Sequence, residues 1–253
     1  MKLASRRIDV PNLKRSDLDE MYALFAKHFA GTDRDRFEAD LVKKDWVVQL
    51  LDQSTGKVGG FSTQMLLKLR SGNAKVNAIY SGDTIVDPAF WNEKTLLNEC
   101  GHLFFELVEQ VHPEPLYWFL ITKGYKTYRF LPVFFHEFFP CHDRPFPAPI
   151  KQTVDLLGNS LFGDNYDEKR GLVVPTSNKE RLRSGIAEIT DGRLEDPHVR
   201  FFLERNPNYA EGCELCCLAL LDKANLTRAG IRLLASGVST PNDSTDQGVS
   251  VGP

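Results

Sequence analysis

The segment that most constrains this chain covers residues 75–110 and predicts a strand, a turn and a helix. Up to Asp87 it carries β-branched and aromatic residues in alternation, as a strand with two different faces does. Pro88 ends the strand, because proline has no N–H to donate to a ladder. A helix capped by Asn92 or Thr95 is expected next, since apolar residues then recur on a 3.6-residue period. That apolar stripe consists of Leu96, Leu97, Cys100, Leu103, Phe104, Leu107 and Val108.

A second strand is expected after this helix. Residues 116–122 are almost entirely apolar, which is typical of a strand buried on both faces beside a parallel neighbour. With the preceding strand and helix they predict a βαβ unit. The helix N-terminus would present unpaired amides and the positive end of a dipole, which can hold an anion such as phosphate. A strand–helix connection without a ligand is the alternative, because no glycine-rich phosphate motif is present.

Two further strands are expected before this unit. Residues 45–51 and 57–69 are strand-like, and the polar turns around Gly56 and Gly72 connect them to each other and to the next strand. Successive hairpins of this kind form an antiparallel meander. A short strand at residues 7–10 and two helices are expected in front of the meander.

The second half of the chain is less regular. The aromatic-rich residues 125–139 are interpreted as a helix that Pro132 interrupts, and the four prolines between residues 140 and 149 predict a linker or a wrapped loop. A last strand is expected at 213–221, after a weakly periodic stretch at 151–171. The predicted division is a core at 1–140, an insertion or extension packed on the core at 141–205, a closing strand and short helix at 206–235, and a disordered tail at 236–253.

Charge and composition argue against several classes of protein. The net charge of −3 and the absence of a basic block do not indicate a nucleic-acid partner. No apolar run approaches the ~18 residues that span a bilayer, and the first residues lack an apolar signal core, so a cytoplasmic protein is expected. Cys213 and Cys216 form a C-x-x-C without a second pair at zinc-ligand spacing. We expect them to be small buried apolar residues of a strand, and we predict no metal site.

The order of these elements resembles the GNAT acyltransferase superfamily over roughly residues 5–140, with 206–221 as a closing strand. Residues 86–88 (Val-Asp-Pro) match the V-x-P motif of that family. The Q/R-x-x-G-x-G/A phosphate loop that follows it in the family is not matched, because residues 92–97 contain no glycine. The resemblance implies an α/β fold with a mixed sheet: an antiparallel meander, a central βαβ unit whose two strands splay apart, and a C-terminal extension.

The resemblance also implies where an acyl donor binds. The pantetheine of acyl-CoA would lie between the splayed strands and the pyrophosphate at the helix N-terminus. Carried over residue by residue, the pantetheine would lie beside Thr84, Ile85 and Val86, and the pyrophosphate near Asn92, Lys94, Thr95 and Leu96. Because the glycines that allow close approach of a phosphate are missing, the donor is either acyl-CoA on a differently shaped or weaker site, or an acyl-carrier protein.

Acyl transfer to an amine requires a base for the attacking nitrogen and an acid for the leaving thiolate. Asp83 is the candidate base, because a carboxylate is seldom buried in a strand of Tyr, Thr and Ile; an exposed or turn-stabilising Asp is the alternative. Ser81 alternates with Asp83 and is expected on the same face. The resemblance implies a tyrosine acid after the second strand, for which Tyr128 is preferred to Tyr125, with packing as the alternative. His136 is a weaker candidate base.

Two functions follow from this reading. The first is an acyltransferase that moves an acyl group from acyl-CoA or an acyl-carrier protein to an amine of a small molecule or a protein. The alternative is a catalytically inactive GNAT-like module that binds a ligand or partner. The missing glycine loop motivates the alternative, as does the segment at 141–205, which could cover the notch between the strands.

Overall fold

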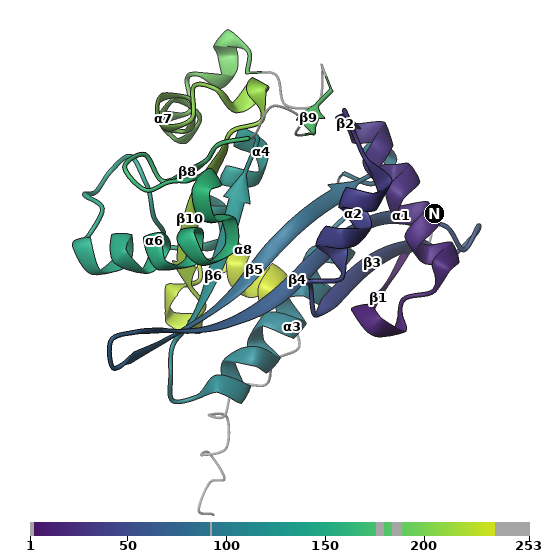
Figure 1. Cartoon of the computed structure of the whole chain (residues 1–253), viewed down its shortest axis with the longest axis horizontal. Coiled ribbons are helices and arrows are strands. Elements are labelled where there is room, and N and C mark those ends of the chain that lie inside the picture. Colours follow the sequence, from purple (N-terminus) through teal and green to yellow (C-terminus); the bar gives the residue numbers. More distant parts are fainter. Residues whose placement is uncertain (1–2, 92, 176–179, 184–188, 236–253) are drawn as a thin grey trace, which may run out of the picture.

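The computed structural model describes residues 3–91, 93–175, 180–183 and 189–235. Eight strands form one mixed sheet, with helices on both faces (Figure 1). The order across the sheet is β1 (Leu3–Asp9), β3 (Trp46–Asp52), β4 (Val58–Ser71), β5 (Ala74–Val86), β6 (Leu116–Thr122), β10 (Glu214–Leu220), β8 (Leu172–Val173) and β7 (Tyr166–Asp167). A separate pair joins β2 (Phe29–Ala30) to β9 (Arg181–Leu182).

The helices divide between the two faces of the sheet. The larger core cluster contains residues of α3, α4, α5, α7 and α8, and the two clusters on the other face contain residues of α1, α2 and α6. Their bounds are α1 Arg15–His28, α2 Arg34–Leu41, α3 Thr95–Val111, α4 Tyr125–Tyr128, α5 Phe130–Phe134, α6 Ala148–Phe162, α7 Pro197–Arg205 and α8 Arg228–Leu234. Short 3-10 turns lie at Val10–Asn12, Pro88–Phe90, Gly163–Asn165, Asp191–Arg193, Tyr209–Glu211 and Lys223–Asn225.

The predicted fold class is confirmed. Strands β3, β4 and β5 form the antiparallel meander, whose long β4–β5 hairpin projects at the lower left of Figure 1. Helix α3 connects β5 to the parallel strand β6, so the βαβ unit is present as predicted. Strand β10 then pairs antiparallel with β6, which extends the sheet past its centre.

Helix α3 is held against the sheet by its apolar stripe. Five of its seven predicted stripe residues, Cys100 among them, belong to the larger core cluster, and the other two, Leu97 and Val108, pack against it from partly buried positions. Gly101 lets α8 cross closely, because a Cβ there would lie 2.3 Å from the carbonyl oxygen of Leu234. The sequence therefore fixes both which face of α3 is buried and where the last helix can pack on it.

One prediction of local structure is wrong, and one helix was not predicted. The aromatic segment is not one helix: α5 ends at Phe134, and the chain continues as extended backbone that bridges Phe135 to Leu226 and Phe139 to Leu218. Pairing with the closing strand outweighs the local helical pattern. Conversely, residues 148–162 form α6, where Gly158 lies so close to the ring of Tyr166 that a Cβ would meet it at 2.6 Å.

Other predictions concern composition and segments. All five cysteines are buried, as expected for small apolar residues. Within the described ranges, no helix combines the length and apolarity that crossing a bilayer requires. The predicted tail at 236–253 lies outside the described residues. The boundaries at 140 and 205 remain predictions, although strands from both sides of them share one sheet.

Candidate functional site

Strands β5 and β6 part in the middle of the sheet. Their parallel pairing covers five residues of each strand and ends at Ser81 and Leu120. Beyond this point β5 stays paired with β4 up to Val86, whereas β6 stays paired with β10 up to Thr122. The two strands therefore form the predicted splayed unit, with one edge of each strand unpaired beyond the last shared residue.

A β-bulge lies on β5 where the strands part. Between the pairs Gln64–Ser81 and Ser62–Thr84, β4 has the single residue Thr63 and β5 has two residues, Gly82 and Asp83. Such a bulge shifts the alternation of side chains by one residue. Accordingly, the alternation switches between Ile79, which packs in the α3 cluster, and Ile85, which packs in the cluster of α1 and α2.

The bulge corrects the prediction that Ser81 and Asp83 share a face. Ser81 faces α3, where its hydroxyl donates to Gln64 Oε1 over 2.7 Å and accepts from Trp118 Nε1 over 2.8 Å. Gln64 in turn donates to the hydroxyl of Ser62 over 2.7 Å. The hydroxyls of Ser62 and the exposed Thr84 lie 2.7 Å apart, so this polar chain leads from the core to the parted edge.

Asp83 lies on the opposite face, half-buried among charged side chains. Burial raises its pKa to about 6; the charges of Asp40 and Glu214 act in the same direction, and those of Lys123 and Lys44 oppose them. Within the described part of the chain, no ion pair or hydrogen bond of its carboxylate is present. A carboxyl group in this state is ionised at neutral pH yet more basic than an ordinary aspartate.

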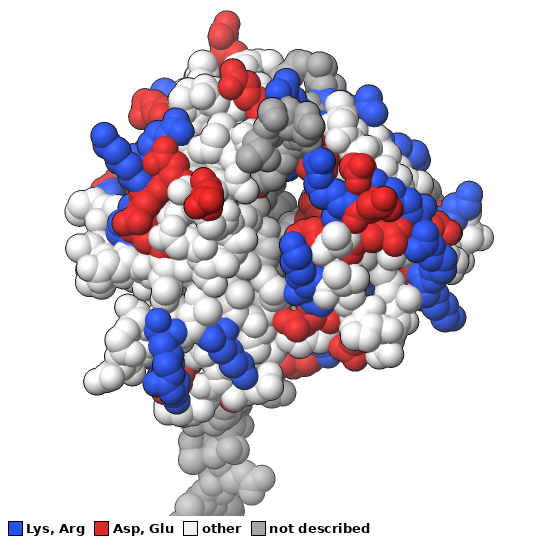
Figure 2. All heavy atoms as spheres, in the orientation of Figure 1, with Lys and Arg blue, Asp and Glu red and all other residues white. Residues whose placement is uncertain are grey.

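The buried Lys44 and the partly buried Lys123 lie near Asp83, and each has an acidic partner of its own, Asp40 and Glu214; these five residues form the charged cluster. Lys44 Nζ lies 2.6 Å from Asp40 Oδ2 and 5.3 Å from the ring centroid of Tyr80. Lys123 Nζ lies 2.7 Å from Glu214 Oε1. Figure 2 shows the surface hollowed between the part that carries α6 and α7 and the part that carries α1 and α2, with side chains of both signs of charge on either side.

Sequence reasoning missed these charged neighbours. Glu214 interrupts an apolar strand, and Lys123 directly follows an apolar one. Either residue could have been selected by the same argument that selected Asp83. The pairing of β10 with β6, which brings Glu214 to this site, could not be predicted from the local sequence.

The donor side of the site is formed by backbone groups. Because the amide of Asp87 donates to Gly59, alternation of the ladder turns the amides of Thr84 and Val86 away from β4, toward the parted edge. The carbonyl of Val86 confirms this direction, since it accepts from Trp91 Nε1 over 2.8 Å. Ile85 is buried and packs on the other face, and by the same alternation its amide faces β4, so of these three predicted residues it offers the donor neither its side chain nor its amide.

The N-terminus of α3 lies just beyond this edge. The helix begins at Thr95 with Lys94 as its N-cap, and no side chain caps it. Thr95 is half-buried and Leu96 is buried, while the predicted contact Asn92 lies outside the described residues. Lys126 Nζ, in the helix that follows β6, lies 4.4 Å from the ring centroid of Trp91, which follows β5. Side chains from the segments after the two parted strands therefore meet.

The predicted acid and the weaker base lie elsewhere. Tyr128 is fully buried, and its hydroxyl donates to the carbonyl of Pro140 over 2.9 Å. Its ring packs against Phe138 and Phe202, and burial raises its pKa far above the ordinary value. His136 is exposed. The structure thus brings neither side chain to Asp83.

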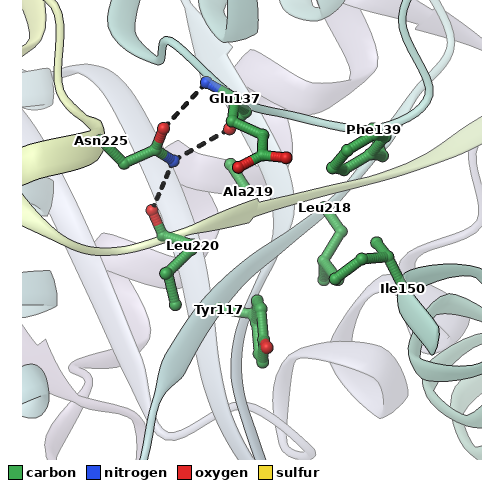
Figure 3. A pocket seen from close by; sticks show the side chains of 8 residues that line it. All are labelled: Tyr117, Glu137, Phe139, Ile150, Leu218, Ala219, Leu220 and Asn225. Atoms are coloured by element: carbon green, nitrogen blue, oxygen red, sulfur yellow. Dashed lines mark hydrogen bonds between the residues drawn. The ribbon is translucent and has the colours of Figure 1, made fainter. Parts of the chain in front are cut away.

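A second hollow lies at the other end of β6. It is a pocket of about 100 Å³ in which Asn225 holds the backbone of Glu137 (Figure 3). Its lining residues are Tyr117, Glu137, Phe139, Ile150, Leu218, Ala219, Leu220 and Asn225. Tyr117 is the second residue of β6, and Lys123 directly follows the strand, so this pocket is roughly 20 Å from the charged cluster along β6.

Comparison with known proteins gives no match to a family model and none to a curated protein. Among solved structures, the chain is similar to a conserved protein of Enterococcus faecalis V583 described as a probable N-acyltransferase, at 14% identity and a TM-score of 0.39 over 51% of this chain and 31% of that one. It is also similar to an acetyltransferase of Trypanosoma brucei, at 17% identity and a TM-score of 0.38 over 58% and 99% of the two chains.

A third structure is a GNAT family N-acetyltransferase of Escherichia coli in complex with CoA, at 14% identity and a TM-score of 0.36 over 51% of this chain and 69% of that one. In fold, the chain resembles GNAT acetyltransferases. The likeness covers about half of the chain and less than a third of the Enterococcus protein. At these identities and TM-scores it concerns the fold alone, and the function has to be inferred from the site.

Proposed function

We propose that this chain is an acyltransferase that moves an acyl group from acyl-CoA to an amine. The observation that supports this most directly is the position of Asp83, a half-buried carboxyl with a pKa of about 6, at the point where β5 and β6 part. On one face of that point lies a polar chain that ends at Thr84, and on the other lies the charged cluster. Donor and acceptor can therefore approach the same place from opposite faces.

The donor would bind along the free edge of β5. The amides of Thr84 and Val86 can pair with the amide groups of a pantetheine arm in the manner of an added strand. The uncapped first turn of α3, with Thr95 and Leu96, can receive the pyrophosphate, and Lys94 adds a cation beside it. An acyl-carrier protein offers the same phosphopantetheine arm without a pyrophosphate, so it is the second donor to test.

The chemistry assigned to Asp83 is proton removal from the acceptor. A primary amine is cationic at neutral pH, and it attacks a thioester only after losing a proton. The nitrogen forms a bond to the carbonyl carbon, the C–S bond breaks, and the proton passes to the Asp83 carboxylate. The leaving thiolate must be protonated. Tyr128 remains the predicted acid for that step. Its hydroxyl donates to the Pro140 carbonyl, so it can protonate the thiolate only in a conformation in which this hydrogen bond is broken.

The test is an acyl-transfer assay with acetyl-CoA, longer acyl-CoAs and acyl-carrier proteins, in which release of free thiol is measured with a panel of amines. Asp83→Asn is expected to lower kcat by about 100-fold or more, because it removes a general base. Asp164→Asn is the matched control, since Asp164 is exposed in the turn after α6.

The inactive binding module makes the opposite prediction. If donors bind and shift the melting temperature but no amine accepts the acyl group, the chain binds a ligand without chemistry. If no thioester donor binds at all, the proposed function is wrong.

A further inference from the structure

Two buried polar atoms beside the charged cluster lack hydrogen-bond partners among the described residues. Glu214 is 4% exposed, and its Oε2 is unpaired although its Oε1 meets Lys123. Thr63 is 2% exposed, and its Oγ1 is also unpaired. Buried polar groups in native structures are almost always hydrogen-bonded, so each exception needs an explanation.

Both atoms flank Asp83. Thr63 is the residue opposite the bulge, and its Oγ1 would lie 2.6 Å from a Cβ on Gly82. Glu214 pairs with Lys123, which directly follows β6, and its charge acts on both Asp83 and Tyr80. The two unpaired atoms thus lie on either side of the proposed base, on the face away from α3.

The cluster has a surplus of negative charge. Lys44 is paired with Asp40 and Lys123 with Glu214, so each lysine already has an acid of its own. Asp83 and the second oxygen of Glu214 are left to accept hydrogen bonds from something else. A ligand that satisfies both must carry two donors and positive charge, and a ligand carboxylate would be repelled.

We infer that Glu214 and Thr63 belong to the acceptor side of the proposed active site and select an amine that carries a second hydrogen-bond donor, as a diamine does. The inference rests on the proposed function, because Asp83 takes the proton of the reacting nitrogen. Glu214 Oε2 accepts a hydrogen bond from the second amino group of the diamine. Thr63 Oγ1 forms a hydrogen bond with one of the two amino groups. Asp83 and Glu214 lie on strands separated by β6, so two strand spacings, roughly 10 Å, are a lower bound on the separation of their backbones, because β5 and β6 part before Asp83. The charge of Glu214 still acts on Asp83 across this gap, so a diamine with a linker of about five carbons is the first length to test.

The test compares a five-carbon diamine with pentylamine as acceptors. The wild type is expected to use the diamine with a kcat/KM at least about tenfold higher, the range of a hydrogen bond to a charged group. Glu214→Gln keeps an oxygen for Lys123 but places a donor where Oε2 was, so it is expected to abolish the preference by raising KM for the diamine. The KM for acyl-CoA stays unchanged. Glu211→Gln, an exposed glutamate just before β10, is the control.

Thr63→Val separates recognition from folding. The hydroxyl has no partner in the described structure, so a purely structural role predicts an equal or higher melting temperature and unchanged kinetics. The inference predicts the same melting temperature with a higher KM for the diamine. Equal use of both amines by the wild type, or an unchanged preference in both variants, overturns it.

Direct binding distinguishes this inference from the proposed function. Calorimetric titration of the diamine into the wild type and into Glu214→Gln needs no donor. If Glu214-dependent binding occurs but no acyl transfer does, the amine site stands and the acyltransferase proposal falls. If acyl transfer occurs and the Glu214→Gln variant keeps the diamine preference, the acyltransferase proposal stands and the amine site falls.

Discussion

At the scale of single residues, the ionisation of Asp83 is the property on which the proposed chemistry depends. Its pKa is about 6 in the folded chain and 3.8 in the ordinary case, so the folded state binds the proton more tightly than the unfolded state. A group with a raised carboxyl pKa stabilises the fold less as pH rises between these two values. The wild type should therefore lose stability between pH 4 and pH 6 through this residue.

Asp83→Asn removes that dependence. Above pH 7 the unfolding free energy of the variant is expected to exceed that of the wild type by about 1 kcal/mol. This is less than the pKa difference alone would give, because the side chain is half-buried and solvent screens its charge. Near pH 4 the two proteins should be equally stable. Urea unfolding at both pH values measures the difference in unfolding free energy. A variant that is less stable than the wild type at high pH would contradict the claim that burial raises the pKa of Asp83.

The rate of acyl transfer should follow the same group. For the wild type, kcat/KM is expected to rise with pH through about 6 and then level, because the base acts when it is ionised. A profile without an inflection in this region would place the base elsewhere.

At the scale of elements, α3 determines whether the parted strands are held in place. Gly101→Ala would place a methyl group against the backbone of Leu234, and backbone cannot move aside as the end of a flexible side chain can. The expected cost is about 1–3 kcal/mol of unfolding free energy, typical of overpacking. Gly192→Ala is the control, since a Cβ there meets nothing within 4 Å. Thermal unfolding of both variants measures the difference, and equal stability would contradict the packing of α8 on α3.

Trp91 provides a probe at the end of β5. Its indole N–H donates to the Val86 carbonyl, at the edge where the donor is proposed to bind, and its side chain is half-exposed. We expect acyl-CoA to displace this hydrogen bond and change the tryptophan fluorescence. Trp91→Phe should remove most of that change and bind the donor a few-fold more tightly, since no indole N–H competes. A fluorescence change that persists in Trp91→Phe would assign it to Trp46 or Trp118.

The elements that sequence could predict are those whose own pattern decides their structure. The meander, α3 and β6 follow from alternation, from a 3.6-residue stripe and from a continuous apolar run, and all are where the sequence puts them. The aromatic segment and α6 were missed because their structure depends on partners distant in sequence, such as Phe139 with Leu218. The bulge at Asp83 belongs to the same class, because one inserted residue reverses a face without changing the local pattern.

At the scale of the whole molecule, the sheet joins both halves of the chain through β6 and β10. Strand β10 supplies buried residues to both faces, and β6 would lose its second neighbour without it. A chain ending at residue 205 is therefore expected to lose cooperative unfolding and native near-ultraviolet circular dichroism. Cooperative unfolding of that shorter chain would show instead that the first part of the molecule is an independent domain.

The central claim is that the parted edge of β5 and the first turn of α3 bind the donor. Hydrogen–deuterium exchange with a non-hydrolysable thioether analogue of acetyl-CoA tests it most directly, because it reports on backbone amides. We predict slower exchange at Thr84, Val86 and the first turn of α3, with the β4–β5 hairpin tip unchanged. Protection confined to the pocket around Tyr117 and Asn225, or no protection on binding, would contradict the claim.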